Sequence, residues 1–222
     1  MYRQDALEAA PLIQRVLVYL NKIIPPSGRP GSDARTAIGD LHVNVYALLI
    51  ADALGSPLDN VFDLVQQAGA TYFAFGAVRD QIEAEAPATL GGNLAKNLCI
   101  DWCLTMQGVC NSGMTFTSRS QVEQIITTLQ QPFYDAEEIA GDSMDQMTFQ
   151  NLIALHASIT NHLVQTALPL PRMIGYQFAD VLPSLVISYR LYGDASRADE
   201  VRDENEIVHP AFCPTIGQAL SA

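Results

Sequence analysis

The acidic stretch from Asp194 to Glu206 is the part of this sequence whose residue types could most directly do chemistry. It contains six carboxylates, and closely placed carboxylates are typical of general acid–base sites. Their spacing, however, is that of a solvated face of a short helix. The predicted inner positions are Ala198, Val201 and Ile207, and the predicted outer ones are Asp199, Glu200, Asp203 and Glu204. We therefore predict that these acids face solvent and carry out no catalysis.

Three cysteines, Cys99, Cys103 and Cys110, share one face of a predicted helix at offsets of four and seven. Thiolate metal sites are usually built from paired C-x-x-C knuckles and a fourth ligand, and this spacing does not supply them. Buried, inert thiols are common in apolar helices. We predict no metal or other cofactor; a thiol- or metal-dependent enzyme is the least favoured alternative.

The histidines do not complete a catalytic pair in sequence. His156 and His162 are six residues apart and so lie off any shared helical face, while His42 and His209 stand alone. The acids of residues 135–145 lack the alternating oxygen ligands and central glycine of a calcium loop. With no motif for a nucleophile and its base, we predict that the protein is not an enzyme.

Charge and composition exclude other classes of function. The net charge is −12, with 24 acids against 12 bases, and such a surface repels a phosphate backbone. Specific nucleic-acid binding is therefore not expected, although DNA could pass such a surface without adhering to it. Only 16% of the residues are charged and 49% are hydrophobic, which favours packing against other subunits.

The chain also lacks the patterns of membrane insertion and export. No apolar run approaches the roughly 18–20 residues that a membrane span needs, and Met1 is followed by polar residues through Asp5 instead of the apolar segment of a secretory signal. We expect synthesis in the cytoplasm of the cell and no membrane span.

Apolar periodicity predicts a series of helices up to about residue 167. They cover residues 5–24, 36–54, 57–68, 70–86, 91–110, 120–131 and 143–167, with a turn or loop at 25–32. Ser56, Ser120 and Ser143 are predicted helix caps, and Pro132 is predicted to interrupt the chain of helices. We place a domain boundary near residue 168, between a helical domain (1–168) and a C-terminal domain (169–222).

The sequence of the C-terminal domain predicts a strand, two short helices around a tight turn, and a closing strand. This order resembles the LysM module, a small β-α-α-β unit, although Ala179 replaces its usual first glycine. We expect Leu185 and Val201 to face a shared core, Gly193 to permit the tight turn and Asn205 to turn the chain. The matching residues are Asp180, Leu185, Tyr192, Gly193, Asp194, Ala198, Glu200, Val201, Asn205, Ile207, Pro210, Ile216 and Gly217.

Residues 149–214 contain a second ordered set of motifs. It consists of the helix through Leu155-His156 into Leu163, the linker Leu168–Arg172, the segment Leu182–Leu185, the run Tyr189–Ala195, the segment Arg197–Val201, and Asn205 followed by Ile207 and His209-Pro210. In this order the motifs resemble the C-terminal region of the Mu-type phage DNA circularisation proteins. Residues 1–148 match that family only as a helical region. The resemblance implies a component of a contractile phage tail, near the junction of tail tube, tape measure and baseplate hub.

The sequence as a whole thus predicts a mainly α protein with a helical body and a LysM-like C-terminal adaptor. The resemblance implies a structural virion protein in a homo-oligomeric ring, with tube, tape-measure and hub proteins as partners. A peptidoglycan-binding LysM-type protein is the main alternative. The predicted module and interface residues are Asp180, Leu185, Tyr189, Tyr192, Gly193, Asp194, Arg197, Val201, Asn205, Ile207, His209, Pro210 and Gly217.

Overall fold

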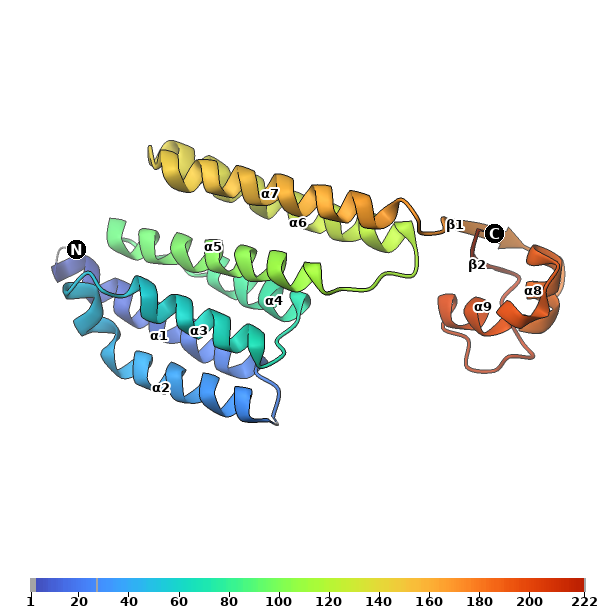
Figure 1. Cartoon of the computed structure of the whole chain (residues 1–222), viewed down its shortest axis with the longest axis horizontal. Helices are drawn as coiled ribbons and strands as arrows, with labels where there is room; N and C mark the ends of the chain where they lie inside the picture. The colour runs from blue at the N-terminus through green and yellow to red at the C-terminus, as the bar shows by residue number, and fades with distance from the viewer. Residues whose placement is uncertain (1–2, 27, 222) are drawn as a thin grey trace. The chain divides into compact units, whose positions relative to one another are not determined.

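A computed structural model describes residues 3–26 and 28–221 of the chain (Figure 1). These residues are mainly helical and include one small two-stranded antiparallel sheet. Ser27 in the predicted turn and residues 1–2 of the predicted start lie outside these ranges. The elements are α1 (Arg3–Ile23), α2 (Arg29–Ile50), α3 (Gly55–Gln67), α4 (Tyr72–Glu83), α5 (Leu90–Ser112), α6 (Arg119–Asp142), α7 (Gln146–Ala167), β1 (Met173–Gln177), α8 (Ser184–Tyr192), a short 3-10 helix η1 (Ala195–Arg197), α9 (Ala198–Glu204) and β2 (Ile216–Leu220).

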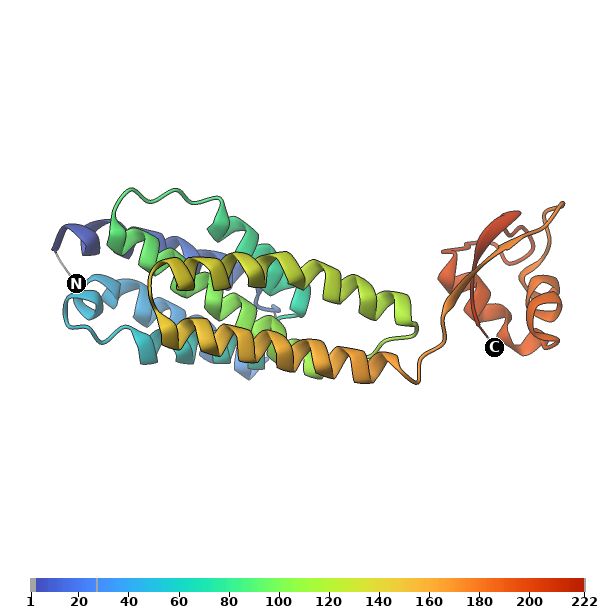
Figure 2. The ribbon, with the colours of Figure 1, turned by 90° about the horizontal axis from the view of Figure 1, so that it is seen from above.

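These elements form two compact units. The first runs to Met114 and also takes in Gln130–Ile159; the second comprises Thr115–Leu129 and the chain from Thr160 onward. The helices α6 and α7 run antiparallel to each other (Figure 2), and each contributes residues to both units.

Helix α1 is the centre of the first unit, because it contacts α2, α3, α4 and α5. Its inward face combines small residues such as Ala6 and Ala9 with larger ones such as Leu17, all fully buried. The small residues let a neighbouring helix approach closely. At that approach a Cβ on Gly91 of α5 would overlap the Asp5 side chain, so this position has no room for a larger residue.

The amino end of α5 is held by Glu8 of α1. The Glu8 carboxylate accepts hydrogen bonds from the backbone N–H of Ala88 (2.8 Å) and of Thr89 (2.7 Å), and from the Thr89 hydroxyl. Thr89 in turn caps the helix by accepting from the Gly92 N–H at 3.0 Å. These hydrogen bonds satisfy helix-terminal donors that otherwise lack partners, and they lower the pKa of Glu8, the Thr89 hydroxyl contributing most.

Aromatic side chains fill the unit between α3, α4 and α5. Phe62 and Phe75 are fully buried, with ring centroids 6.4 Å apart, and Trp102 stacks on Phe62 at 5.9 Å. Such offset pairs add to the gain from burying apolar area.

The predicted interruption at Pro132 is wrong, since α6 continues through it. A proline inside a helix removes one donor, but Phe133, Ala136 and Ala140 after it are buried along one face of α6. Burial of this face holds the second half of the helix in line despite the missing hydrogen bond.

The predicted serine caps are also wrong. Helix α3 begins at Gly55 without a side-chain cap. Asp145 and not Ser143 caps α7, accepting from the Thr148 N–H at 3.1 Å, and Ser118 accepts from the Gln121 N–H at 3.4 Å at the start of α6. Several oxygen-bearing residues compete at these helix starts, and tertiary packing decides between them.

The predicted linker at 168–172 is anchored inside the second unit by Arg119. The Arg119 guanidinium donates to the backbone oxygens of Leu170 (2.9 Å) and Leu168 (2.7 Å), and the Arg119 N–H donates to the Pro171 oxygen (3.0 Å). The linker is therefore hydrogen-bonded along its length and is not a free tether.

Within residues 3–26 and 28–221, no helix has the length and apolar character required to cross a membrane.

Replacing Glu8 by glutamine tests the hold on α5. Because the folded-state pKa lies below the ordinary value of 4.5, the ionised carboxylate stabilises the fold above that pH, and the stabilisation is lost as the pH falls through the folded-state pKa. We expect Glu8→Gln to lower the melting temperature at pH 7 by a few degrees, and the difference from wild type to shrink below about pH 4. Glu138→Gln, at an exposed site on α6, is the control and should have no such effect; a constant difference at all pH values would contradict the assignment.

Candidate functional site

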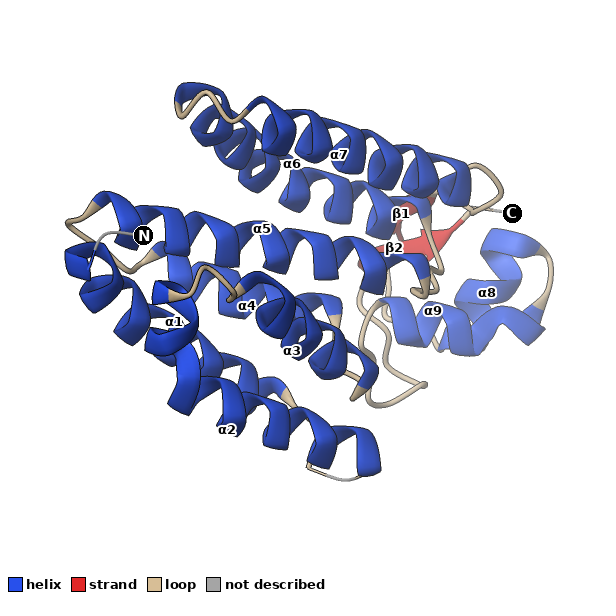
Figure 3. Cartoon of the chain, turned by 60° about the vertical axis from the view of Figure 1, so that its left-hand side comes forward, coloured by secondary structure: helices blue, strands red, loops and turns tan. Residues whose placement is uncertain are grey.

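The C-terminal segment contains most of the predicted site residues. Its strands pair antiparallel, with Met173 opposite Leu220 and Gln177 opposite Ile216, next to α8 and α9 (Figure 3). A small core lies between helices and sheet, formed by Tyr176, Ile187, Val201, Cys213 and Ala219. The order strand–helix–helix–strand is thus the one predicted from the sequence.

Asn205, at the end of α9, hydrogen-bonds to the outer edge of β2. Its side-chain oxygen accepts from the Gln218 N–H at 2.7 Å, and its side-chain nitrogen donates to the Gln218 oxygen at 2.6 Å. The same nitrogen donates to the Val201 oxygen at 2.7 Å. One amide therefore pairs with β2 as a neighbouring strand would and also ties β2 to α9.

Gly217 is required by this arrangement. A Cβ at position 217 would lie 2.5 Å from both the Asn205 side-chain oxygen and the Tyr176 hydroxyl, which is well inside van der Waals contact. Gly217 was predicted to belong to the module, and its role there is to leave room for this close packing.

The turn between α8 and α9 is built by Gly193 and Asp194. Gly193 has a φ of 72°, a left-handed conformation that glycine adopts without strain. The Asp194 carboxylate accepts from the Ser196 N–H at 2.8 Å and from its hydroxyl at 2.6 Å. The hydroxyl contributes most to lowering the pKa of Asp194, so this carboxylate is an ionised structural cap.

The acids of the opening stretch are paired with arginines or exposed. Arg197 makes two hydrogen bonds to Glu200 (2.6 and 3.0 Å), and its guanidinium carbon lies 3.8 Å from the centre of the Tyr192 ring. Asp199 and Asp203 are mostly exposed and lie beside Arg202. The prediction of a solvated face is confirmed for these two carboxylates, whereas Glu200 and Glu204 are half-buried.

Leu185 does not face the core, contrary to the prediction. It is 59% exposed, and Tyr189, one turn later, is 64% exposed. Because α8 begins at Ser184, Ile187 is turned inward and takes the position assigned to Leu185. Leu185 and Tyr189 instead form an exposed ridge on α8.

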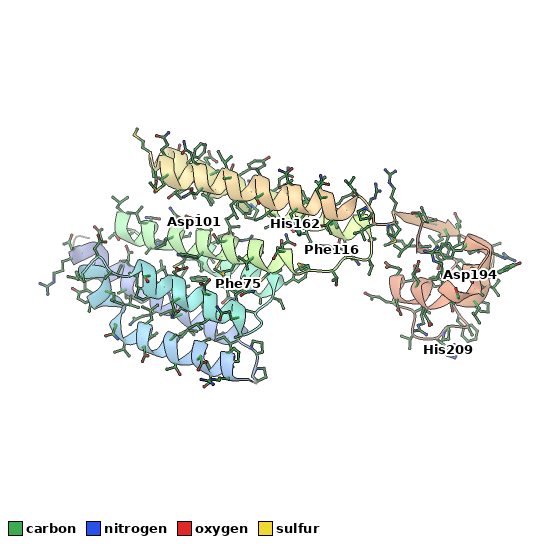
Figure 4. All side chains as sticks on the ribbon, viewed as in Figure 1. Phe75, Asp101, Phe116, His162, Asp194 and His209 are labelled. Carbon is green, nitrogen blue, oxygen red and sulfur yellow. The ribbon has the colours of Figure 1, made fainter. Side chains whose placement is uncertain are left out.

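The remaining predicted residues lie around this core. Asp180 is exposed, and Ile207 packs partly buried against the core. The Pro210 oxygen accepts from the Ser184 N–H at 2.8 Å, while exposed His209 lies 5.2 Å, ring to ring, from Phe212. Figure 4 shows His209 and Asp194 in separate places, so they do not form one site.

In the described part of the chain, Cys99, Cys103 and His156 lie in packed or hydrogen-bonded surroundings. Cys99 and Cys103 are fully buried; burial raises the pKa of Cys99 to about 12 and that of Cys103 well above its ordinary value. His156 stacks on Phe133 with ring centroids 4.7 Å apart, and its Nδ1 lies 3.0 Å from a Glu137 carboxylate oxygen. The described residues include no group of three or more His, Cys, Asp or Glu side chains that could hold a metal.

A groove that the sequence analysis did not predict lies in the first unit, between α5 and the second half of α6. It has a volume of about 690 Å³, and its walls combine apolar side chains with carboxylates. Asp101 of α5 lies on the side facing α6 (Figure 4). Burial, and to a lesser extent the charge of Asp145, raise the pKa of Asp101 from 3.8 to about 7.

The other charged residues of the groove have partners. Lys96 donates to the backbone oxygens of Glu83 (2.8 Å) and Glu85 (2.7 Å) at the end of α4. Glu83 lies 3.2 Å from Arg79, and Asp135 accepts from Gln131 at 2.7 Å. Burial raises the pKa of Glu83, and the charge of Asp135 adds to this effect.

The chain matches no protein-family model and no curated protein sequence. Its function is therefore inferred from these residues and their geometry.

Asn205→Ala tests the closing of the sheet. The variant loses three hydrogen bonds and leaves two backbone groups of Gln218 to water, and we expect it to destabilise the C-terminal segment by about 1–3 kcal/mol. Amide hydrogen exchange is the direct measurement, because the Gln218 N–H should exchange about five- to hundredfold faster. Asn151→Ala, at an exposed position of α7, is the control. Unchanged protection of Gln218 would contradict the role of Asn205.

Asp101→Asn tests the burial of that carboxyl group. Since the folded-state pKa lies above the ordinary one, ionisation destabilises the fold progressively between about pH 4 and pH 7 and by a constant amount above that range. This rise in the pKa of Asp101 corresponds to a loss of at most about 4 kcal/mol in the free energy of unfolding. We expect the variant to be more stable than wild type at pH 8 and equal to it near pH 4, measured by denaturant unfolding. Asp63→Asn, at an exposed site of α3, should not show this dependence, and a variant less stable at pH 8 would refute the assignment.

Proposed function

We propose that this chain is a structural, non-enzymatic component of a contractile phage tail that joins the tail tube to the baseplate hub as a homo-oligomeric ring. The observation that carries the proposal is the C-terminal segment. It follows the β-α-α-β order of a LysM-like module, and the residues matching that pattern, among them Gly193, Asn205 and Gly217, have structural roles in it. The resemblance of residues 149–214 to the Mu-type circularisation proteins is the reason for proposing a contractile phage tail and a position at the junction of tube and hub.

The exposed ridge of α8 supports a role in protein contact. Val186 on the same helix is also exposed, as is Val181 just before the helix. Exposed apolar side chains at several positions of one short helix are typical of protein–protein contacts, where an aromatic residue often provides an anchor. We assign this ridge to the contact with a tube or hub protein.

The charge of the chain supports the passage of DNA through such a ring. Its net charge of −12 repels phosphate at short range, so a DNA strand moving past it would be neither bound nor slowed. The negative charge would therefore suit a protein that takes part in DNA delivery without binding DNA.

The proposal is tested by the protein content of purified phage particles. We expect mass spectrometry to find the chain in intact tails in several copies, in fixed ratio to the baseplate hub. The double variant Leu185→Ser/Tyr189→Ser should fold normally, because both side chains are exposed, yet its incorporation should fall at least about tenfold. Val43→Ser, at an exposed position of α2, is the matched control, and absence of the wild-type chain from purified particles would refute the proposal.

A sedimentation assay with murein sacculi separates this function from peptidoglycan binding, which the same β-α-α-β order also allows. We expect the protein to stay in the supernatant. Saturable co-sedimentation that a Leu185→Ser/Tyr189→Ser variant retains would favour the peptidoglycan-binding alternative.

A further inference from the structure

The groove between α5 and α6 combines an apolar strip with acidic edges. Leu94 and Leu98 lie one turn apart on α5 and are 50% and 39% exposed, and Ile139 of α6 is 42% exposed. Pro132, Ala136 and Ala140 add small apolar side chains on the α6 side. Spacing of four residues along one helix is what a second helix needs to set its own apolar side chains between the leucines.

The charge around this strip is negative. Four carboxylates line the groove, those of Glu83, Asp101, Asp135 and Asp145, against the single ammonium of Lys96. That ammonium is bonded to the carbonyl oxygens at the end of α4, where it interacts with the negative end of a helix, so it does not neutralise Asp101. No described group donates a hydrogen bond to the Asp101 carboxylate.

We infer that this groove binds a basic amphipathic helix of another protein, which sets its apolar face on Leu94, Leu98 and Ile139 and its Lys or Arg side chains near Asp101 and Asp135. A cationic side chain is the partner that a partly buried carboxylate lacks, because an opposite charge within hydrogen-bonding reach offsets the cost of burial. A second copy of this chain is disfavoured at this groove, because none of the described helices is strongly basic and so none would complement the four carboxylates.

Every residue of the groove belongs to the first unit, and none lies on the α8 ridge. The groove is therefore a separate contact site, and its test is independent of whether the chain is found in phage particles.

The test uses the full chain and a synthetic helix. The probe is a fluorescein-labelled amphipathic peptide of about 18 residues, five helical turns, made only of leucine and lysine; a peptide of the same pattern with glutamate for lysine is its control. We expect fluorescence anisotropy to show saturable binding of the lysine peptide that weakens with salt and no binding of the glutamate peptide. Hydrogen exchange should show protection in α5 and in the second half of α6.

Two double variants separate the apolar and the charged contributions. Leu94→Gln/Leu98→Gln and Asp101→Asn/Asp135→Asn should each weaken binding at least about tenfold, and the second should also reduce the salt dependence. Leu7→Gln/Val43→Gln and Asp63→Asn/Glu123→Gln change the same residue types at exposed positions elsewhere and control for nonspecific attraction to an acidic protein. Circular dichroism and melting temperature establish that each variant is folded.

Three results would overturn the inference. The first is wild-type affinity in both groove variants, and the second is protection by the peptide at other helices only. The third is self-association of the chain, measured by sedimentation, that the Leu94→Gln/Leu98→Gln variant abolishes, because the occupant would then be a second copy.

Discussion

The C-terminal segment depends on one amide side chain that takes the place of a missing strand. A two-stranded sheet is marginally stable in water on its own, and β2 gains from Asn205 the pair of hydrogen bonds that a third strand would otherwise provide. That requirement fixes the place where α9 ends and excludes any side chain at Gly217. It also keeps Tyr176 and Val201 in one small core, so the end of α9 and the edge of β2 are joined by a single side chain.

Helix α5 combines a tightly packed side with an open one. On one side its first turn is held by Glu8, and its thiols lie in an interior that disfavours their ionisation. On another side Leu94 and Leu98 remain partly exposed beside Asp101, whose pKa is raised to about 7. The contrast indicates that the buried cysteines serve packing, whereas the apolar side chains on the open side are accessible to the helix that we infer as the ligand of the groove.

Periodicity was sufficient to predict the succession of helices, the strand at β1 and the closing strand β2, because the helical and strand periods are local. The loop predicted at 25–32 is wrong from Arg29 on, since α2 begins there and holds Pro30 in its first turn, where a proline is tolerated. Periodicity failed where neighbouring residues compete: Ser56 and Ser143 are good cap types, yet packing placed the helix starts elsewhere, and Pro132 is held inside α6 by the burial of Phe133. Leu185 and Ile187 are both apolar, so only the start of α8 decides which of them faces the core. The groove could not be predicted, because its walls come from α5 and α6, whose residues are more than thirty positions apart in the sequence.

The hydrogen bonds of Arg119 to the Leu168–Pro171 segment have a mechanical consequence. Three bonds from one residue hold the backbone oxygens of Leu168, Leu170 and Pro171, so tension applied through β1 is shared among them before the end of α7 is reached. Part of a pull on β1 is therefore carried to the start of α6. In the contractile tail that we propose for this chain, such a coupling would leave less of the stroke to be spent in straightening the segment.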